Sequence, residues 1–171
     1  MIEMPIADFF KLPAEEGGGE TAFREVEYQI LMEMAQYTRL VLATGGGIVE
    51  RRDNWGLLRH GLVVFLDANP EDIATRLSSN SEELAKRPLL QQSDNPLNKL
   101  QELSSKRRDM YLQADIHCKV EPQWTPEQVA DRVVRDTLEF IAANPPLWQS
   151  WKAKRDQVAV EAAARVSERL S

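Results

Sequence analysis

The sequence predicts an α/β fold in which a parallel β-sheet lies between two layers of helices. Short apolar runs that indicate buried strands alternate along the chain with segments of helical periodicity. A glycine triplet, 45–47, directly follows the first of these runs. Its 171 residues, 43% of them hydrophobic, are enough for one domain with its own core. Together these observations favour a doubly covered, three-layer sheet.

The first predicted helix and strand come directly before the glycine triplet. The helix spans about 21–36, with Thr21 as the expected N-cap after a glycine-rich approach. Its apolar residues recur at helical spacing: Phe23, Val26, Ile30 and Met34. The run at 39–43 predicts a buried strand that stops at the glycines.

A short helix and a second strand are predicted next. The helix covers 53–60, and Gly61 is expected to end it as a C-terminal cap. The run at 62–67 predicts a buried strand. Asn69 and Pro70 then form a strong helix start, since asparagine caps a helix and proline suits its first turn.

The second half of the chain predicts one further strand between two helices. Polar residues dominate 78–94, which is therefore expected to be a mobile connection. A helix is expected after Asn95, and alternation over 115–121 predicts a strand near the edge of the sheet. A last core helix is expected from Thr125 to Asn144. These elements give a domain at 1–144, followed by a helical extension at 145–171.

Composition excludes several classes of protein. The net charge of -6 argues against nucleic-acid binding, which needs a basic surface. The longest apolar run, 62–66, is too short to cross a membrane. The single cysteine, Cys118, excludes an internal disulfide and fits a reducing compartment. We therefore expect a soluble protein without nucleic-acid or membrane partners.

Four arginines and the glycine triplet are candidates for chemistry. Arg24 precedes Glu27 by three residues, so both lie on one helix face, as they would in an ordinary surface ion pair. Arg87 lies in the polar connection, and Arg107 and Arg108 lie near a helix end where a cation suits the helix dipole. Gly45–Gly47 follow a predicted parallel strand, at the sheet edge where ligands bind in such folds.

Histidine and cysteine residues do not indicate a metal site. His60 precedes the predicted capping glycine, and His117 points outward from the predicted edge strand. Cys118 alternates inward as a small core residue. Because no pair of these residues has metal-ligand spacing, no site formed by protein ligands alone is expected.

Six segments, taken in order, resemble the shikimate kinase family. They are "IADFF", "GETAFREVE", "ATGGGIV", "GLVVFLDANPEDIATRL", "KRPLL" and "KRRDMYLQADIHCKV", within about 2–143. The resemblance implies an ATP-dependent kinase that phosphorylates the 3-hydroxyl of shikimate in aromatic amino acid (chorismate) biosynthesis. The segment around the glycines is most similar to cyanobacterial or plastid members, which implies cytoplasm or plastid stroma. It also implies a P-loop kinase-like fold and a monomer.

The same resemblance implies roles for individual residues. Arg24 and Arg107 would bind the carboxylate of shikimate, with Glu27 holding both arginines. Gly45, Gly46 and Gly47 would let the backbone approach the substrate ring. Arg87 would act catalytically from a lid over the phosphates of ATP. Gln123 would contact ATP. Mg²⁺ would accompany ATP.

One family feature is absent from the sequence. There is no G-x-x-x-x-G-K-[ST] loop and no Asp-x-Asp, so the residues that cradle phosphates and hold magnesium are missing. We expect a fold that lacks its first two strands, a segment of roughly 30 to 40 residues upstream of Met1 that contains the loop, and no activity of this chain alone. The alternative is a non-catalytic binding or regulatory module. A gluconate or nucleotide kinase is disfavoured by "FREVE" and "KRPLL".

Overall fold

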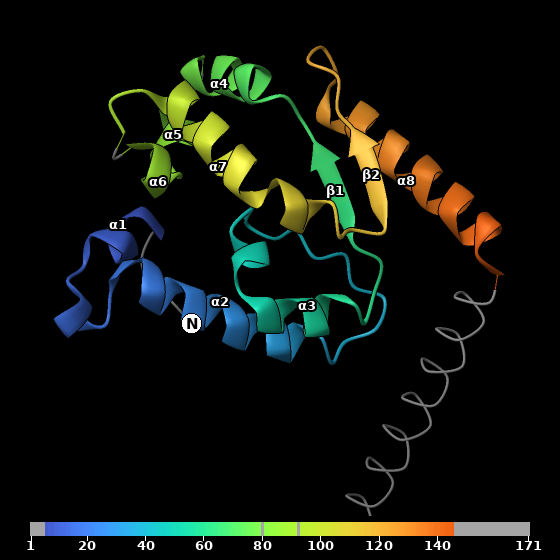
Figure 1. Cartoon of the computed structure of the whole chain (residues 1–171), viewed down its shortest axis with the longest axis horizontal. Helices are drawn as coiled ribbons and strands as arrows, with labels where there is room; N and C mark the ends of the chain where they lie inside the picture. The colour runs from blue at the N-terminus through green and yellow to red at the C-terminus, as the bar shows by residue number, and fades with distance from the viewer. Residues whose placement is uncertain (1–5, 80, 92, 146–171) are drawn as a thin grey trace, which may run out of the picture. The chain divides into compact units, whose positions relative to one another are not determined.

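The computed structural model of the chain divides into two units, Met1–Thr125 and Pro126–Ser171. Figure 1 labels the described helices and strands. The structure describes residues 6–79, 81–91 and 93–145. In the second unit the described helix is α8, Pro126–Ala143, as the sequence predicts for this segment. Except for residue 145, the predicted extension 145–171 lies outside the described residues. All remaining elements belong to the first unit.

The first unit alternates helices with two strands. Its elements in chain order are α1 Ile6–Lys11, η1 Ala14–Glu16, α2 Gly19–Met34, η2 Ile48–Glu50, α3 Arg52–Leu58, β1 Val64–Asp67, α4 Pro70–Ser78, α5 Ser81–Ala85, α6 Pro88–Gln91, α7 Pro96–Tyr111 and β2 Ile116–Lys119. Helix α7 packs against α4, α6 and η2, while α2 packs against α1, α3 and η2.

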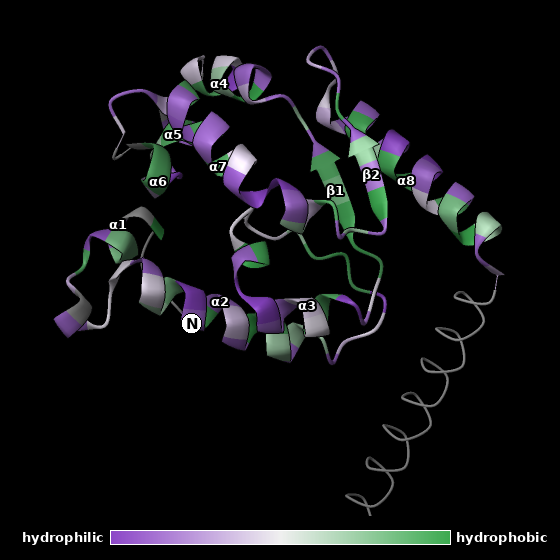
Figure 2. Cartoon of the chain, in the orientation of Figure 1, coloured by the Kyte–Doolittle hydropathy of each residue, from purple (hydrophilic) through white to green (hydrophobic). Residues whose placement is uncertain are grey.

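The two strands form a parallel pair, which confirms the α/β class. Val64 lies opposite Ile116 and Asp67 opposite Lys119, and α4 to α7 form the crossover between the strands. Strand β1 is hydrophobic for most of its length (Figure 2). In β2 the predicted alternation is confirmed, since Ile116 and Cys118 are buried and His117 is exposed.

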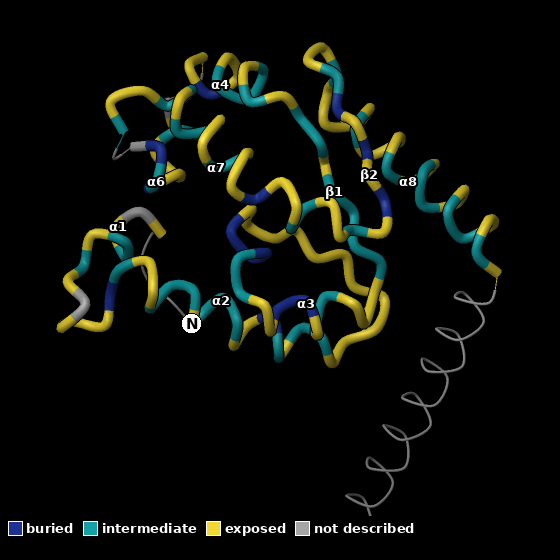
Figure 3. The backbone as a smooth tube through the Cα atoms, in the orientation of Figure 1, coloured by how far each residue is buried: buried dark blue, intermediate teal, exposed yellow. Residues whose placement is uncertain are grey.

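The predicted strand at 39–43 is wrong. No strand is assigned there, and residues 36–46 are exposed (Figure 3). Val41 is 96% exposed, and Leu40 and Leu42 are also exposed. Within the described residues no strand lies beside this segment to pair with its backbone. A strand without a pairing neighbour leaves its amides and carbonyls to water, so an apolar sequence by itself does not form one.

Two helix boundaries and one buried position also differ from the prediction. Helix α2 begins at Gly19 with Gly18 as N-cap, and not after the predicted cap Thr21. Gly17 and Gly19 adopt φ of 75° and 85°, a left-handed conformation that glycine accepts more readily than threonine does. The buried residue of α2 is Leu31 rather than Ile30. Helix α3 ends before Gly61, which does not adopt the left-handed conformation of a capping glycine.

The asparagine caps are confirmed, but the polar connection is more ordered than predicted. The Oδ1 atoms of Asn69 and Asn95 accept hydrogen bonds from the backbone N–H groups of Glu71 and Asn98. Each cap precedes a proline in the first turn. The segment 78–94 contains α5 and α6, since serine and proline provide helix starts even in polar sequence.

The core of the first unit includes the residues that directly follow the glycine loop. Leu31, Ile48, Val49 and Trp55 form a buried cluster against which Met110 and Tyr111 pack. Asn54 is fully buried, and its Nδ2 donates a 2.7 Å hydrogen bond to the carbonyl of Ile48. This bond fixes the turn that directly follows the glycines. No helix of the described chain is long and apolar enough to span a bilayer.

We predict that Asn54→Ala lowers the free energy of unfolding by about 1–3 kcal/mol, because it leaves a buried carbonyl without its donor. Urea denaturation measures the change. Asn98→Ala, at an exposed position of α7, is the matched control and is expected to stay within about 0.5 kcal/mol of the wild type. Equal stability of both variants would contradict the assigned role of Asn54.

Candidate functional site

Arg24 lies in α2 between two carboxylates. Its Nη1 donates to Glu27 Oε2 at 2.8 Å and its Nη2 to Glu20 Oε1 at 3.2 Å. Glu20, Arg24 and Glu27 are spaced by four and three residues, which places them on one face of the helix. The Arg24 and Glu27 side chains are mostly buried. The buried Nε of Arg24 has no partner among the described residues.

Arg107 is the buried arginine of α7. Its Nε donates to Glu50 Oε1 at 2.9 Å, and Lys106 donates to the same oxygen at 3.1 Å. Burial by itself would lower the pKa of Arg107, but hydrogen bonds and charge from Glu50 and Tyr111 outweigh it and raise the pKa. For Glu50 burial acts in the other direction and would raise the pKa, but Arg107 and Lys106 hold the pKa below its ordinary value. The pair is therefore fully charged at neutral pH.

The glycine loop, residues 45–47, lies against both arginines. A Cβ on Gly47 would overlap the guanidinium of Arg24. A Cβ on Gly46 would lie 3.0 Å from Tyr111 Oη and 3.9 Å from Arg107 Nη1. A Cβ on Gly45 would lie 3.4 Å from Glu27 Oε1. The triplet thus allows the close approach of backbone to charged side chains, which a side chain would block at Gly47 above all.

We call Arg24, Glu27, Glu50, Arg107 and the glycine loop the arginine cradle. The predicted site residues of α2, the glycine loop and α7 all lie here. The two predicted residues that lie elsewhere are Arg87 and Gln123. Glu27 contacts Arg24, while Arg107 is held by Glu50 instead. A planar guanidinium binds a carboxylate through two parallel hydrogen bonds. Two such groups beside a glycine loop can bind a small carboxylic acid.

Arg87 and Gln123 do not contact the cradle. Arg87 lies between α5 and α6, where it is exposed and its Nη2 is 3.9 Å from Glu83 Oε2. Gln123 lies in the exposed turn after β2. Neither position brings these side chains to Arg24 or Arg107 in this structure, so their predicted roles stay predictions.

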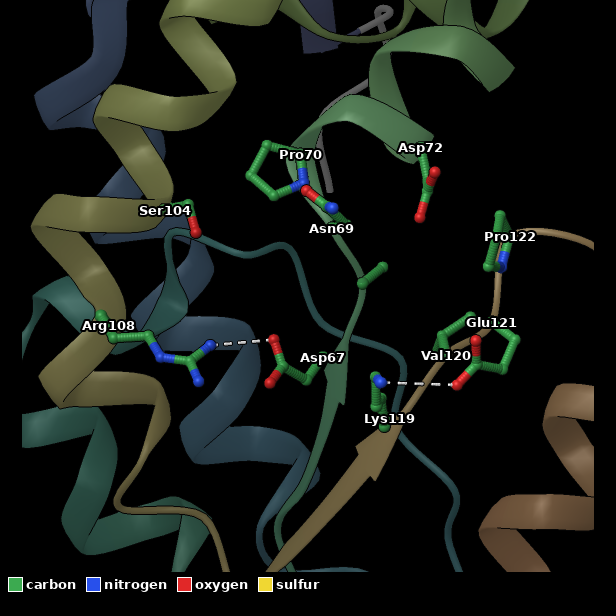
Figure 4. A pocket seen from close by; sticks show the side chains of 11 residues that line it. Asp67, Asn69, Pro70, Asp72, Ser104, Arg108, Lys119, Val120, Glu121 and Pro122 are labelled. Carbon is green, nitrogen blue, oxygen red and sulfur yellow. Dashed lines mark hydrogen bonds and ion pairs between the residues drawn. The ribbon is translucent and has the colours of Figure 1, made fainter.

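A separate pocket of about 400 Å³ opens at the carboxyl ends of β1 and β2 (Figure 4). Four of its charged residues form two ion pairs: Arg108 Nη1 contacts Asp67 Oδ1 at 2.9 Å and Lys119 Nζ contacts Glu121 Oε1 at 3.6 Å. Asn69 and Ser104 add neutral polar groups to the lining. Gln123 follows directly after Pro122, a lining residue. The carboxyl edge of a parallel sheet is where α/β proteins bind ligands.

The described residues contain no cluster of three or more His, Cys, Asp or Glu side chains that could hold a metal ion. Cys118 is fully buried in β2.

Two residues at this site are absent from the sequence-based set: Glu50 of the cradle, and Tyr111, which contacts the glycine loop. Glu50 lies three residues after Gly47, and Tyr111 lies four residues after Arg107 in α7. The spacing of Tyr111 places it on the arginine's face of the helix and could have indicated the contact. Nothing local relates Glu50 to Arg107, which is 57 residues away.

The parallel strands and the helical crossover define an α/β protein, and the paired arginines of the cradle suit a small anion. A model of the family "SKI: Shikimate kinase" matches residues 1–138. The chain belongs to the shikimate kinase family.

Cyanobacterial relatives and one solved structure agree with this family. The shikimate kinase of Synechococcus sp. (strain JA-3-3Ab) is 45% identical over 128 residues, 75% of this chain and 66% of the relative. That of Trichormus variabilis is 43% identical, over 74% of this chain and 68% of the relative. The shikimate kinase from Acinetobacter baumannii in complex with shikimate has a TM-score of 0.58 and 32% identity, over 74% and 66% of the two chains. The chain thus spans about two thirds of these relatives' length.

We predict that Glu50→Gln destabilises the protein by about 1 kcal/mol at pH 7, because the carboxylate loses its charge-assisted bonds. The folded state lowers the pKa of Glu50, so its stabilisation is present above the pKa of a free glutamate, about 4.3, and is lost as the pH falls through the folded value. The difference between wild type and variant should therefore shrink below about pH 4.3.

Urea unfolding at several pH values measures this difference. Glu102→Gln, which removes an exposed carboxylate of α7, is the control and should change stability little at any pH. A wild-type-minus-variant difference that stays constant down to pH ~3 would count against the Glu50–Arg107 pair as its source.

Proposed function

We propose that the chain provides the shikimate-binding side of a shikimate kinase, which transfers the γ-phosphoryl group of ATP to the 3-hydroxyl of shikimate. The observation that supports this most directly is the arginine cradle, because two buried guanidinium groups at one backbone loop suit a single carboxylate. Shikimate is also the ligand named for the A. baumannii relative. The three-layer, P-loop kinase-like sheet is part of the same proposal.

In this function Arg24 and Arg107 bind the carboxylate from two helices. Their acidic partners keep them charged and ordered before the substrate arrives, which reduces the entropy lost on binding. A carboxylate that reaches the cradle can use the terminal guanidinium N–H groups of Arg107, since Glu50 contacts its Nε. The backbone of Gly45–Gly47 can then approach the ring of the substrate.

Arg87 and Gln123 would serve the nucleotide. Arg87 is exposed in the connection between α5 and α6, a position from which a lid arginine could stabilise charge that develops on the phosphates. Gln123 adjoins the pocket at the strand ends, so it could contact ATP there. Since the described residues form no metal-ligand cluster, Mg²⁺ would come with ATP, and no step of this proposal is assigned to it.

The sequence has no G-x-x-x-x-G-K-[ST] loop, and we propose that these 171 residues alone bind shikimate without phosphoryl transfer. Phosphoryl transfer depends almost wholly on positioning and charge stabilisation of the phosphates. The same absence favours the second candidate, a non-catalytic binding or regulatory module. Both candidate functions use the cradle. If the chain is part of a kinase, a chimera that adds a phosphate-binding loop should restore turnover, and if it is a non-catalytic module, the chimera should not.

We predict that calorimetric titration of the purified chain detects shikimate binding while a coupled assay with ATP and shikimate detects no turnover. Binding is expected because hydrogen bonds to Glu27 and Glu50 hold Arg24 and Arg107 in place. The assay is run beside a full-length cyanobacterial relative as positive control. Turnover near that of the relative would refute the proposed inactivity, and the absence of binding would refute the proposed function of the cradle.

We also predict that Arg107→Ala weakens shikimate binding by about 10- to 100-fold, the value of a lost charge-assisted hydrogen bond pair. Arg87→Ala is the matched control and should leave shikimate affinity within about twofold, since Arg87 lies outside the cradle. In a version with a phosphate-binding loop, Arg87→Ala should instead lower kcat. Equal losses of shikimate affinity in both variants would argue against the assignment.

A further inference from the structure

The glycine loop of the cradle has three carbonyls, and each has a different partner. Gly45 O accepts from the backbone N–H of Ile48 at 3.1 Å, and Gly47 O accepts from that of Glu50 at 3.1 Å. Gly46 O accepts from the hydroxyl of Tyr111 at 2.8 Å. The central carbonyl is thus fixed by a side chain from α7, while the two outer carbonyls are fixed by the backbone turn itself.

This hydrogen bond also sets the direction of a backbone donor. The carbonyl of Gly46 and the N–H of Gly47 belong to one planar trans peptide, in which they point in opposite directions. When Tyr111 holds Gly46 O, it therefore holds the Gly47 N–H as well. Glycines leave this peptide free to rotate, so an external constraint is needed to select one orientation.

The ring of Tyr111 is itself held in place. It stacks on Phe65 of β1, with ring centroids 4.9 Å apart and planes 16° apart. It also packs against the core cluster that contains Ile48 and Val49, the residues directly after the loop. A tyrosine with a stacked ring has few remaining degrees of freedom, so the position of its hydroxyl is well defined.

Arg107 lies close to both Tyr111 and the glycine loop. It lies one turn before Tyr111 in α7, and the tips of both side chains reach the space above Gly46. Interaction with the Tyr111 hydroxyl contributes to the raised pKa of Arg107, after burial, which acts the other way, and the hydrogen bond to Glu50. The Tyr111 hydroxyl is therefore the point at which the guanidinium and the loop peptide meet.

We propose that Tyr111 is a positioning residue for the carboxylic acid that the cradle binds: its hydroxyl fixes the Gly46–Gly47 peptide relative to Arg107. This inference rests on the proposed function. In this proposal the Tyr111 hydroxyl affects ligand affinity, whereas the Tyr111 ring only packs against the core.

Tyr111→Phe tests the proposal, because it keeps the stacked ring and removes only the hydroxyl. Tyr37→Phe is the matched control, since Tyr37 is exposed in the turn after α2. Shikimate binding is measured by calorimetry on the full chain. The loss of one neutral hydrogen bond predicts about three- to tenfold weaker binding for Tyr111→Phe and unchanged binding for Tyr37→Phe.

Two-dimensional NMR without ligand supplies a second readout, which reports on the loop peptide itself. The amide nitrogen of Gly47 shares its peptide with Gly46 O, so its resonance should move in Tyr111→Phe more than those of other loop residues. The hydrogen-bonded amides of Ile48 and Glu50 should exchange about three- to tenfold faster. Tyr37→Phe should leave all three amides unchanged.

The outcomes separate this inference from the function on which it rests. If the wild-type chain does not bind shikimate, the proposed function fails and the inference fails with it. If the wild type binds and Tyr111→Phe binds equally well, only the inference is overturned. Weaker binding by Tyr111→Phe, together with the Gly47 shift and faster exchange at Ile48 and Glu50, supports it.

Discussion

The candidate site depends on the close approach of the glycine loop to charged side chains. A Cβ at Gly47 would overlap the guanidinium of Arg24, and one at Gly46 would lie 3.0 Å from the Tyr111 hydroxyl. Buried guanidinium groups are tolerated only when carboxylates pair with them, and Glu27 and Glu50 fulfil this requirement. The glycines let backbone, arginines and acids occupy one small volume.

The hydrophobic core of the first unit holds the glycine loop in place. Ile48 and Val49, which follow the glycines directly, are buried against Leu31 of α2 and Trp55 of α3. The buried Asn54 donates a hydrogen bond to the backbone of the same turn. The loop that binds ligand in our proposal is therefore anchored by its apolar neighbours, so its geometry is set by packing as well as by charge.

Much of the fold was predictable because local rules suffice for it. The helix starts at Asn69 and Asn95 are confirmed, since capping is decided within four residues. The alternation of β2 is confirmed, since one buried face sets a period of two. The strand at 39–43 could not be predicted correctly from its apolar run, because a strand exists only where another strand pairs with it. Similarly, the true start of α2 depends on left-handed glycines rather than on Thr21.

The sequence by itself determined the α/β class, the resemblance to shikimate kinases and the set of arginines and glycines that meet in the cradle. Segments such as "ATGGGIV" and "FREVE" are local patterns, so they can be recognised without coordinates. Only the tertiary structure decided which acid holds which arginine. Glu27 reaches Arg24 within one helix turn, whereas Glu50 and Tyr111 connect α7 to a loop about 60 residues earlier. Contacts of this kind follow from the packing of α7 on the loop. Spacing along the chain indicates only that Tyr111 shares a helix face with Arg107.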